Sequence, residues 1–161
     1  MSRVGIVGLG PGAISAPDSI ETWSIPWGGA LTHDVYFEIH KDWRTILNED
    51  SNYQDRLECL PLVYFIGEKP IANSDIYPLD EVTEMFGCYL ESSIAYMLAK
   101  AILDGYKEIE LYGISGDDKY TMQRPNLEYL IGFGRGKGLK ISVQSESKLL
   151  TSEFESGRYG N

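Results

Sequence analysis

The chain has 161 residues, of which 43% are hydrophobic and 24% charged, and these values fit one globular domain rather than a disordered, collagen-like or coiled-coil protein. Its 14 basic and 24 acidic residues leave a formal net charge of −10, so phosphate backbones and anionic membranes repel it. We therefore expect no nucleic-acid or membrane partner. A small anionic ligand remains compatible with this charge, because local N–H groups can bind it.

The N-terminus and the cysteines indicate where the protein resides. No apolar run approaches the roughly 18–20 residues of a membrane span, and the apolar run after Arg3 breaks at Gly8, too early for a signal peptide. Cys59 and Cys88 lack the spacing of a metal or redox site, which predicts two reduced thiols. We therefore predict a cytoplasmic protein without a metal site. The sequence identifies no cofactor and leaves a homo-oligomer open.

Short apolar segments rich in Val, Ile, Tyr or Phe alternate with stretches of helical spacing. Such segments are typical of parallel strands covered on both faces, and they occur at residues 4–7, 35–39, 62–66, 109–112 and 139–143. The alternation predicts an α/β fold, namely a single Rossmann-like domain over residues 1–150 with a mostly parallel, doubly wound sheet of about five strands. Residues 151–161 lack apolar periodicity and are predicted to form a flexible C-terminal tail.

Two helices are predicted from apolar residues spaced three and four apart. The first covers residues 90–104, with Ser92 and Ser93 as capping hydroxyls and Gly105 as its stop. The second begins near Pro125, a residue favoured in the first helical turn, and ends by Gly136. A weaker helix is predicted around residues 43–47. Residues 68–87 are predicted to form an irregular crossover with at most a short helix.

The first predicted strand runs directly into a glycine-rich turn, Gly8-Leu9-Gly10-Pro11-Gly12. At this place in α/β folds, glycines let the backbone approach a phosphate and direct N–H groups at it. The spacing differs from the dinucleotide fingerprint and no Gly-Lys-Ser/Thr follows, so neither a standard dinucleotide site nor a Walker A loop is expected. Contact with a phosphate or nucleotide is the preferred interpretation, and a purely structural tight turn is the alternative.

Glu38 and His40 stand two residues apart at the end of the second predicted strand, so their side chains share a face. This end belongs to the C-terminal edge, where open α/β sheets bind ligands. We predict His40 as a general base and Glu38 as the carboxylate that tunes it. A polar pair that closes the strand is the alternative.

Further candidates lie at the same edge. Ser92 and Ser93 begin a helix whose N–H groups and dipole favour an anion, although plain N-capping explains them equally well. Gln123 and Arg124 follow the fourth predicted strand together with Lys119, and Arg124 is predicted to pair with a phosphate. A solvated loop with a helix cap is the alternative. Base stacking or peripheral core packing is open to four aromatic residues, Trp23, Trp27, Tyr89 and Tyr120.

The segment 92–114 resembles two related groups of proteins. One is the small bacterial sialyltransferases that use a CMP-sugar donor, and the other is the MptE-like (DUF115) proteins, which include 6-hydroxymethylpterin diphosphokinases. Both begin with a strand and a Gly-x-Gly-Pro-Ser type turn, similar to the glycine turn here. The runs 37–40 and 123–130 resemble those of uncharacterised tailed-phage proteins of this type. The resemblance implies that the phosphate-bearing donor is held by Gly8, Gly10, Pro11, Gly12, Ser92 and Ser93.

Some positions depart from the pattern of these groups. Gly12 replaces the usual Ser, and Ser115-Gly116 stands where an Ile-Asp or Val-Asp pair is common. The second change loses an acidic contact or moves it to Asp117. The catalytic His that the sialyltransferases carry downstream of this loop has no counterpart in the chain.

Three functions fit these residues. The preferred one is binding of a small phosphorylated nucleotide-type ligand at the C-terminal edge of the sheet, to sequester or sense it. The first alternative is a glycosyl- or phosphoryl-transferase with a nucleotide-activated donor, in which His40 is the base and Arg124 stabilises the leaving phosphate together with the turn. The second alternative is an interaction protein with a vestigial site.

Overall fold

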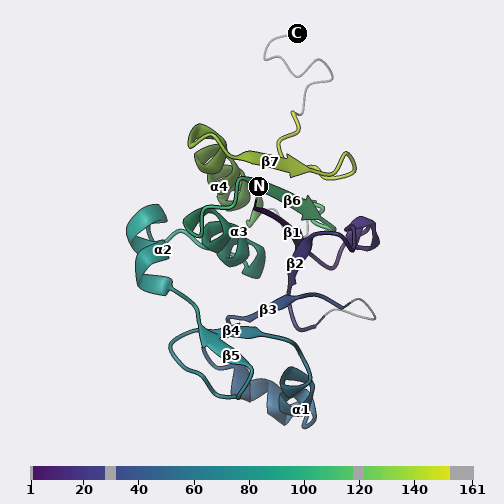
Figure 1. Ribbon diagram of the computed structural model, residues 1–161, viewed down its shortest axis with the longest axis vertical. Helices are drawn as coiled ribbons and strands as arrows, with labels where there is room; N and C mark the ends of the chain where they lie inside the picture. The colour runs from purple at the N-terminus through teal and green to yellow at the C-terminus, as the bar shows by residue number, and fades with distance from the viewer. Residues whose placement is uncertain (1, 28–31, 118–121, 153–161) are drawn as a thin grey trace.

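Parallel strands form one sheet in the computed structural model, which describes residues 2–27, 32–117 and 122–152. The sheet has seven strands in the described residues, in the spatial order β5-β4-β3-β2-β1-β6-β7 (Figure 1). Every neighbouring pair is parallel. The strands are β1 (Arg3–Val7), β2 (Glu21–Ser24), β3 (Val35–Glu38), β4 (Val63–Phe65), β5 (Ser74–Ile76), β6 (Glu108–Tyr112) and β7 (Lys140–Val143).

The direction of winding reverses once, between β1 and β6. The chain adds strands outward from β1 to β5, then returns to place β6 on the opposite side of β1. In open α/β sheets, the crevice at such a reversal is where ligands bind, beyond the carboxyl ends of the two strands. The turns after Val7 and Tyr112 therefore meet at the position that a ligand site requires.

Helical segments cover both faces of the sheet. In Figure 1 three helices lie together on one side, α2 (Leu79–Phe86), α3 (Ser93–Leu103) and α4 (Arg124–Gly136). The other side carries two 3₁₀ segments, η1 (Ala13–Ser15) and η2 (Trp43–Asn48), and the short helix α1 (Tyr53–Glu58). This arrangement confirms the predicted Rossmann-like, doubly wound class, with seven strands instead of about five.

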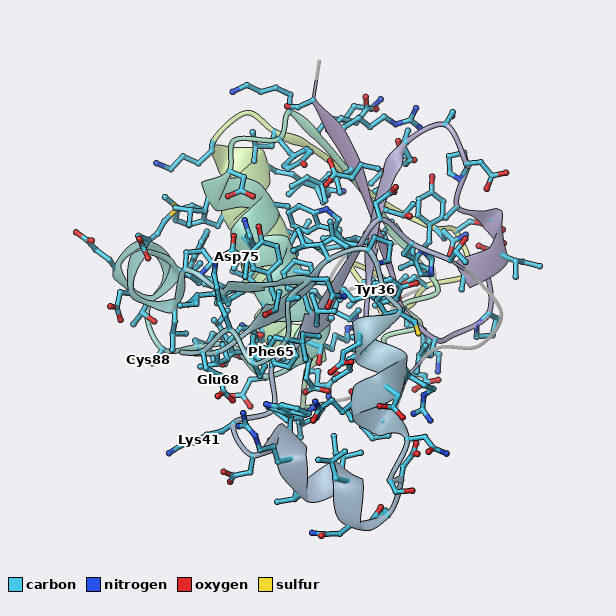
Figure 2. All side chains as sticks on the ribbon, turned by 60° about the horizontal axis from the view of Figure 1, so that its bottom comes forward. Tyr36, Lys41, Phe65, Glu68, Asp75 and Cys88 are labelled. Carbon is cyan, nitrogen blue, oxygen red and sulfur yellow. The ribbon has the colours of Figure 1, made fainter. Side chains whose placement is uncertain are left out.

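The alternation of side chains along each strand divides the apolar residues into two cores. Phe37 of β3 packs with Trp23 in the larger core, beneath α2, α3 and α4. Its neighbour Tyr36 points the other way, into a smaller core with Trp43 and Phe65. In Figure 2, Tyr36 and Phe65 lie on the side of the sheet that η2 and α1 cover.

The two strands absent from the sequence prediction are β2 and β5, and both lack a continuous apolar run. Glu21–Ser24 is polar at three of four positions, and its buried Ser24 hydroxyl donates to the carbonyl of Val7 at 2.8 Å. Ser74–Ile76 lies at the edge of the sheet, within the stretch predicted to be irregular. That stretch also contains α2, which agrees with the short helix allowed there.

The helix predictions hold in the main. The structure places α3 and α4 where periodicity predicts them, with Gly105 at φ 81° after α3 and Pro125 in the first turn of α4. The weak helix around residues 43–47 is a 3₁₀ helix instead of an α-helix, and α1 was not predicted. Within the described ranges, no helix is long and apolar enough to cross a membrane.

The structure covers the expectations for the C-terminal tail and for the cysteines only in part. Of the predicted tail, residues 153–161 lie outside the described residues, while the Thr151 hydroxyl donates to the carbonyl of Lys148 at 2.6 Å. Cys59 and Cys88 are both exposed and free, and Cys88 lies at the edge of the molecule in Figure 2. The described part of the chain contains no cluster of residues suited to a metal ion.

Candidate functional site

A cleft of about 720 Å³ lies at the β1/β6 reversal, at the C-terminal edge of the sheet. The turns after β1 and β6, the end of β3 and the starts of α3 and α4 line it. The fold therefore brings together most of the predicted site residues, namely Gly8, Gly10, Pro11, His40, Ser92, Ser93, Gln123 and Arg124. Gly12 and Glu38 are not among the lining residues.

The glycine turn packs closely against the turn after β6. The N–H of Gly8 donates to the carbonyl of Tyr112 and that of Gly10 to the carbonyl of Gly113, both at 2.8 Å. A Cβ at Gly8 or Gly10 would lie 2.6 Å from the Gly113 oxygen. Both glycines are thus required by the contact between the two turns. Their N–H groups are already bonded, so their role toward a ligand remains a prediction.

Gly12 contacts the end of β7 instead of the cleft. Its φ is 89°, and its carbonyl accepts a hydrogen bond from Gln144 Nε2 at 3.1 Å. The Gln144 Oε1 accepts from the N–H of Gly113 at 2.8 Å, so one amide ties the two turns together. A Cβ at position 12 would lie 2.5 Å from Gln144 Oε1. The Ser that is usual in the resembling families would therefore be strained by the positive φ and would displace the Gln144 amide.

The start of α3 supplies the hydrogen-bond donors of the cleft. The Ser92 side chain is the N-cap and accepts from the N–H of Ala95 at 3.2 Å. Ser93 and Ile94 follow as the first helical residues, and their N–H groups have no acceptor within the helix. Both residues line the cleft. Helix α4 also begins there, at Arg124, so two helix N-termini contribute partial positive charge.

Arg124 lines the cleft, but its guanidinium is already engaged. Its Nε donates to Glu128 Oε1 at 2.8 Å, and Nη2 donates to the carbonyl of Thr151 at 2.8 Å. The ion pair with Glu128 offsets the positive charge of Arg124, which the sequence predicts to pair with a phosphate. Gln123 is the N-cap of α4, without a capping hydrogen bond from its side chain. Lys119 lies outside the described residues.

A chain of hydrogen bonds links His40 to the interior. The Glu38 carboxylate is buried and accepts from the hydroxyl of Tyr53, from His40 Nδ1 at 2.6 Å and from the His40 N–H at 3.0 Å. Burial, and then the bond to Glu38, raises the pKa of Tyr53 well above its usual value, so it stays a protonated donor. Because Nδ1 faces the carboxylate, Nε2 is the ring nitrogen available to a ligand.

Charged side chains alone do not make the cleft attractive to anions. Its described lining residues include His40 and the paired Arg124 on the basic side and Glu91 and Asp117 on the acidic side. One oxygen of Asp117 is buried and has no hydrogen-bond partner in the described part of the chain. The groups of the cleft that suit an anion are therefore the two helix N-termini and not its charged side chains.

Several site residues carry no clear signal in the sequence. The apolar wall of the cleft consists of Ile25, Ile39, Leu90, Ile94, Ile114 and Leu127, and Tyr96 lines the cleft beside it. The packing of the elements that supply these residues could not be known in advance. Tyr53 reaches Glu38 from α1, a helix that was not predicted. Gln144 had a signal, because it directly follows a strand at the ligand-binding edge.

The aromatic candidates for base stacking lie elsewhere. Trp23 is buried in the core, while Trp27 and Tyr89 are exposed and do not line the cleft. Tyr120 lies outside the described residues. Tyr96, whose ring packs on Tyr77 with centroids 5.2 Å apart, is the aromatic lining residue that the structure describes.

The fold is sialyltransferase-like. It matches the sialyltransferase CstII from Campylobacter jejuni in complex with cytidine-5'-monophosphate, with a TM-score of 0.61 at 17% identity over 92% of this chain and 82% of that chain. It also matches the sialyltransferase CST-II in complex with a trisaccharide acceptor and CMP, with a TM-score of 0.57 at 15% identity over 94% and 89% of the two chains. No family model and no curated protein matches the sequence. The MptE-like and phage-type resemblances stay predictions.

Proposed function

We propose that the cleft binds a small phosphorylated nucleotide of the CMP or CMP-sugar class. The observation that carries this proposal is the start of α3, where the N–H groups of Ser93 and Ile94 border a cleft of about 720 Å³ and have no acceptor among the described residues. Ligand sites for small molecules typically measure about 300–1,000 Å³. Helix N-termini bind phosphate even in an acidic protein, because the interaction is short-range. The cytidine nucleotides in the CstII structures support the choice of base.

Isothermal titration calorimetry with CMP and with cytidine tests this proposal through the variant Ser93→Asp. An aspartate in the first turn suits the helix dipole, so α3 is retained, while its charge repels a phosphate. We expect CMP binding to weaken at least about tenfold, which corresponds to about 1.4 kcal/mol. Asn48→Asp is the matched control, because it adds the same charge at an exposed site in η2 outside the cleft. Equal CMP affinity in the two variants, or cytidine binding as tight as CMP binding, would contradict the proposal.

A second candidate function is glycosyl transfer from the nucleotide-activated donor, and the His40–Glu38–Tyr53 hydrogen bonds favour it. In this reaction His40 Nε2 takes the proton of an acceptor hydroxyl while its oxygen attacks the anomeric carbon of the donor. The bond from that carbon to the phosphate oxygen breaks, and CMP leaves with the electron pair. Glu38 holds the ring through Nδ1 and stabilises the imidazolium that forms.

Release of CMP from CMP-N-acetylneuraminate separates the functions. A transferase releases CMP, and His40→Asn lowers turnover roughly 10²–10⁴-fold with CMP affinity unchanged. Binding of the donor without release favours a protein that sequesters or senses the nucleotide. Neither binding nor release would leave an interaction protein with a vestigial site.

A further inference from the structure

A second hollow, of about 610 Å³, lies beside His40 and is separate from the first cleft. The chain after β2 and helix α1 line it, mainly through Pro26, Trp27, Asn52, Tyr53, Asp55 and Arg56. Tyr53 is shared between this hollow and the hydrogen bonds to Glu38, and Trp27 contacts the ring of His40 edge-on, with centroids 6.2 Å apart. Trp27 and Tyr53 therefore connect the hollow to the histidine that lines the first cleft, although His40 itself does not line the hollow.

Trp27 differs from the other tryptophans of the chain in being exposed. Trp23 and Trp43 are each 2% exposed, whereas Trp27 is 46% exposed. Its ring is held in place by Tyr53, with centroids 5.2 Å apart and an interplanar angle of 33°. A fixed, flat and partly exposed indole suits a ligand with an apolar face and a polar periphery. A pyranose ring has this character, since its C–H groups cluster on one face and its hydroxyls lie around the edge.

The rim of the hollow carries hydrogen-bonding groups at the level of this aromatic surface. Asn52 and Asp55 are exposed, and their side chains have no partner within the described ranges. Arg56 lies over the Tyr53 ring, 5.3 Å from its centroid, and its Nη1 pairs with Asp50 at 2.5 Å. The Asn52 amide can accept from and donate to neutral hydroxyls, and the Asp55 carboxylate accepts from them, whereas this carboxylate repels a phosphate.

We propose that this hollow binds a neutral saccharide, with one pyranose ring against Trp27 and its hydroxyls bonded to Asn52 and Asp55. Its position next to His40 makes the saccharide the acceptor of the glycosyl transfer, and this assignment rests on the second proposed function. The acceptor hydroxyl then approaches His40 from the Trp27 side, while the donor occupies the cleft that His40 lines.

Fluorescence quenching by acrylamide provides a direct measurement, because Trp27 is the exposed tryptophan. The probes are lactose, N-acetyllactosamine and maltose at millimolar concentration, with saturation-transfer NMR on the same samples. We expect at least one of these saccharides to lower the quenching constant about twofold or more. Trp27→Ala should abolish the transfer signal, and Asp55→Asn should weaken binding about five- to tenfold. Tyr89→Ala, which removes an exposed aromatic outside both hollows, should change neither readout.

The outcomes distinguish this proposal from the nucleotide site. If none of the three saccharides protects the indole, or if Trp27→Ala binds them as the wild type does, the saccharide site is refuted. Calorimetry with CMP on the same protein is independent of that result, since Trp27 does not line the nucleotide cleft. Saccharide binding without CMP binding would refute the nucleotide proposal and leave the saccharide site standing.

Discussion

Removal of a single oxygen atom tests the hydrogen bonds that hold His40. In Tyr53→Phe, the Glu38 carboxylate loses the hydroxyl that donates to it, while both residues remain 0–1% exposed. A hydrogen bond to a charged group contributes about 1.5–3 kcal/mol, and the carboxylate oxygen is left without this donor. We therefore expect the free energy of unfolding to fall by about 1.5–3 kcal/mol, as measured by urea denaturation at pH 7 with far-UV circular dichroism.

Tyr77→Phe is the matched control for this prediction. Tyr77 is equally buried, but its hydroxyl donates to the neutral carbonyl of Tyr96 at 2.8 Å. Removal of the Tyr77 hydroxyl oxygen should lower the free energy of unfolding by about 0.5–1.5 kcal/mol. In a Glu38→Gln background, the loss in free energy of unfolding caused by Tyr53→Phe should also fall to about this smaller value, because the acceptor has become neutral. If Tyr53→Phe costs no more than Tyr77→Phe, and the same with and without Glu38→Gln, the carboxylate is not the partner that we infer.

Two further predictions concern stability. Gly10→Ala should destabilise the fold by roughly 1–3 kcal/mol, since its Cβ would lie 2.6 Å from the Gly113 backbone oxygen. Gly132→Ala, in an open position of α4, should instead stabilise the fold by about 0.5–1 kcal/mol. Changes of the same sign in the melting temperatures of the two variants would contradict this reasoning. Burial lowers the pKa of His33 below its usual 6.5, so its folded-state contribution is present above pH 6.5 and is lost as the pH falls through the lowered pKa. The melting temperature should therefore drop on acidification below pH 6.5, and less so in His33→Gln; equal slopes would refute the assignment.

The predicted strands were those whose burial on both faces leaves an apolar run in the sequence, as in Val35–Glu38. Strand β2 was missed because its polar side chains find partners in distant parts of the chain: Ser24 donates to the carbonyl of Val7, the Thr22 hydroxyl donates to Asp34, and Glu21 accepts from Tyr106. A local pattern does not reveal such partners. The topology of the reversal was accessible in outline, because strand–helix alternation with parallel pairing restricts the possible folds.

The same distinction applies to the candidate site. Residues that directly follow a strand or begin a helix, such as His40 and Ser93, could be placed at the ligand edge from the sequence. The Arg124–Glu128 pair, four residues apart within α4, also had a local signal in the sequence. The loss of the Gly8 and Gly10 N–H groups to the carbonyls of Tyr112 and Gly113 had none. These contacts depend on which strand lies beside β1, and the sequence alone did not specify that neighbour.

The Gln144 bridge has a consequence for the order in which the molecule is assembled. It joins Gly12 to a residue 132 positions later, and the N–H groups of Gly8 and Gly10 donate to the carbonyls of Tyr112 and Gly113. Contacts between such distant residues form slowly, because a long loop must close before they gain any stability. The glycine turn is made early during synthesis, yet it acquires its final shape only when β6 and then β7 have joined the sheet. The cleft at the β1/β6 reversal is therefore among the last features that the growing chain completes.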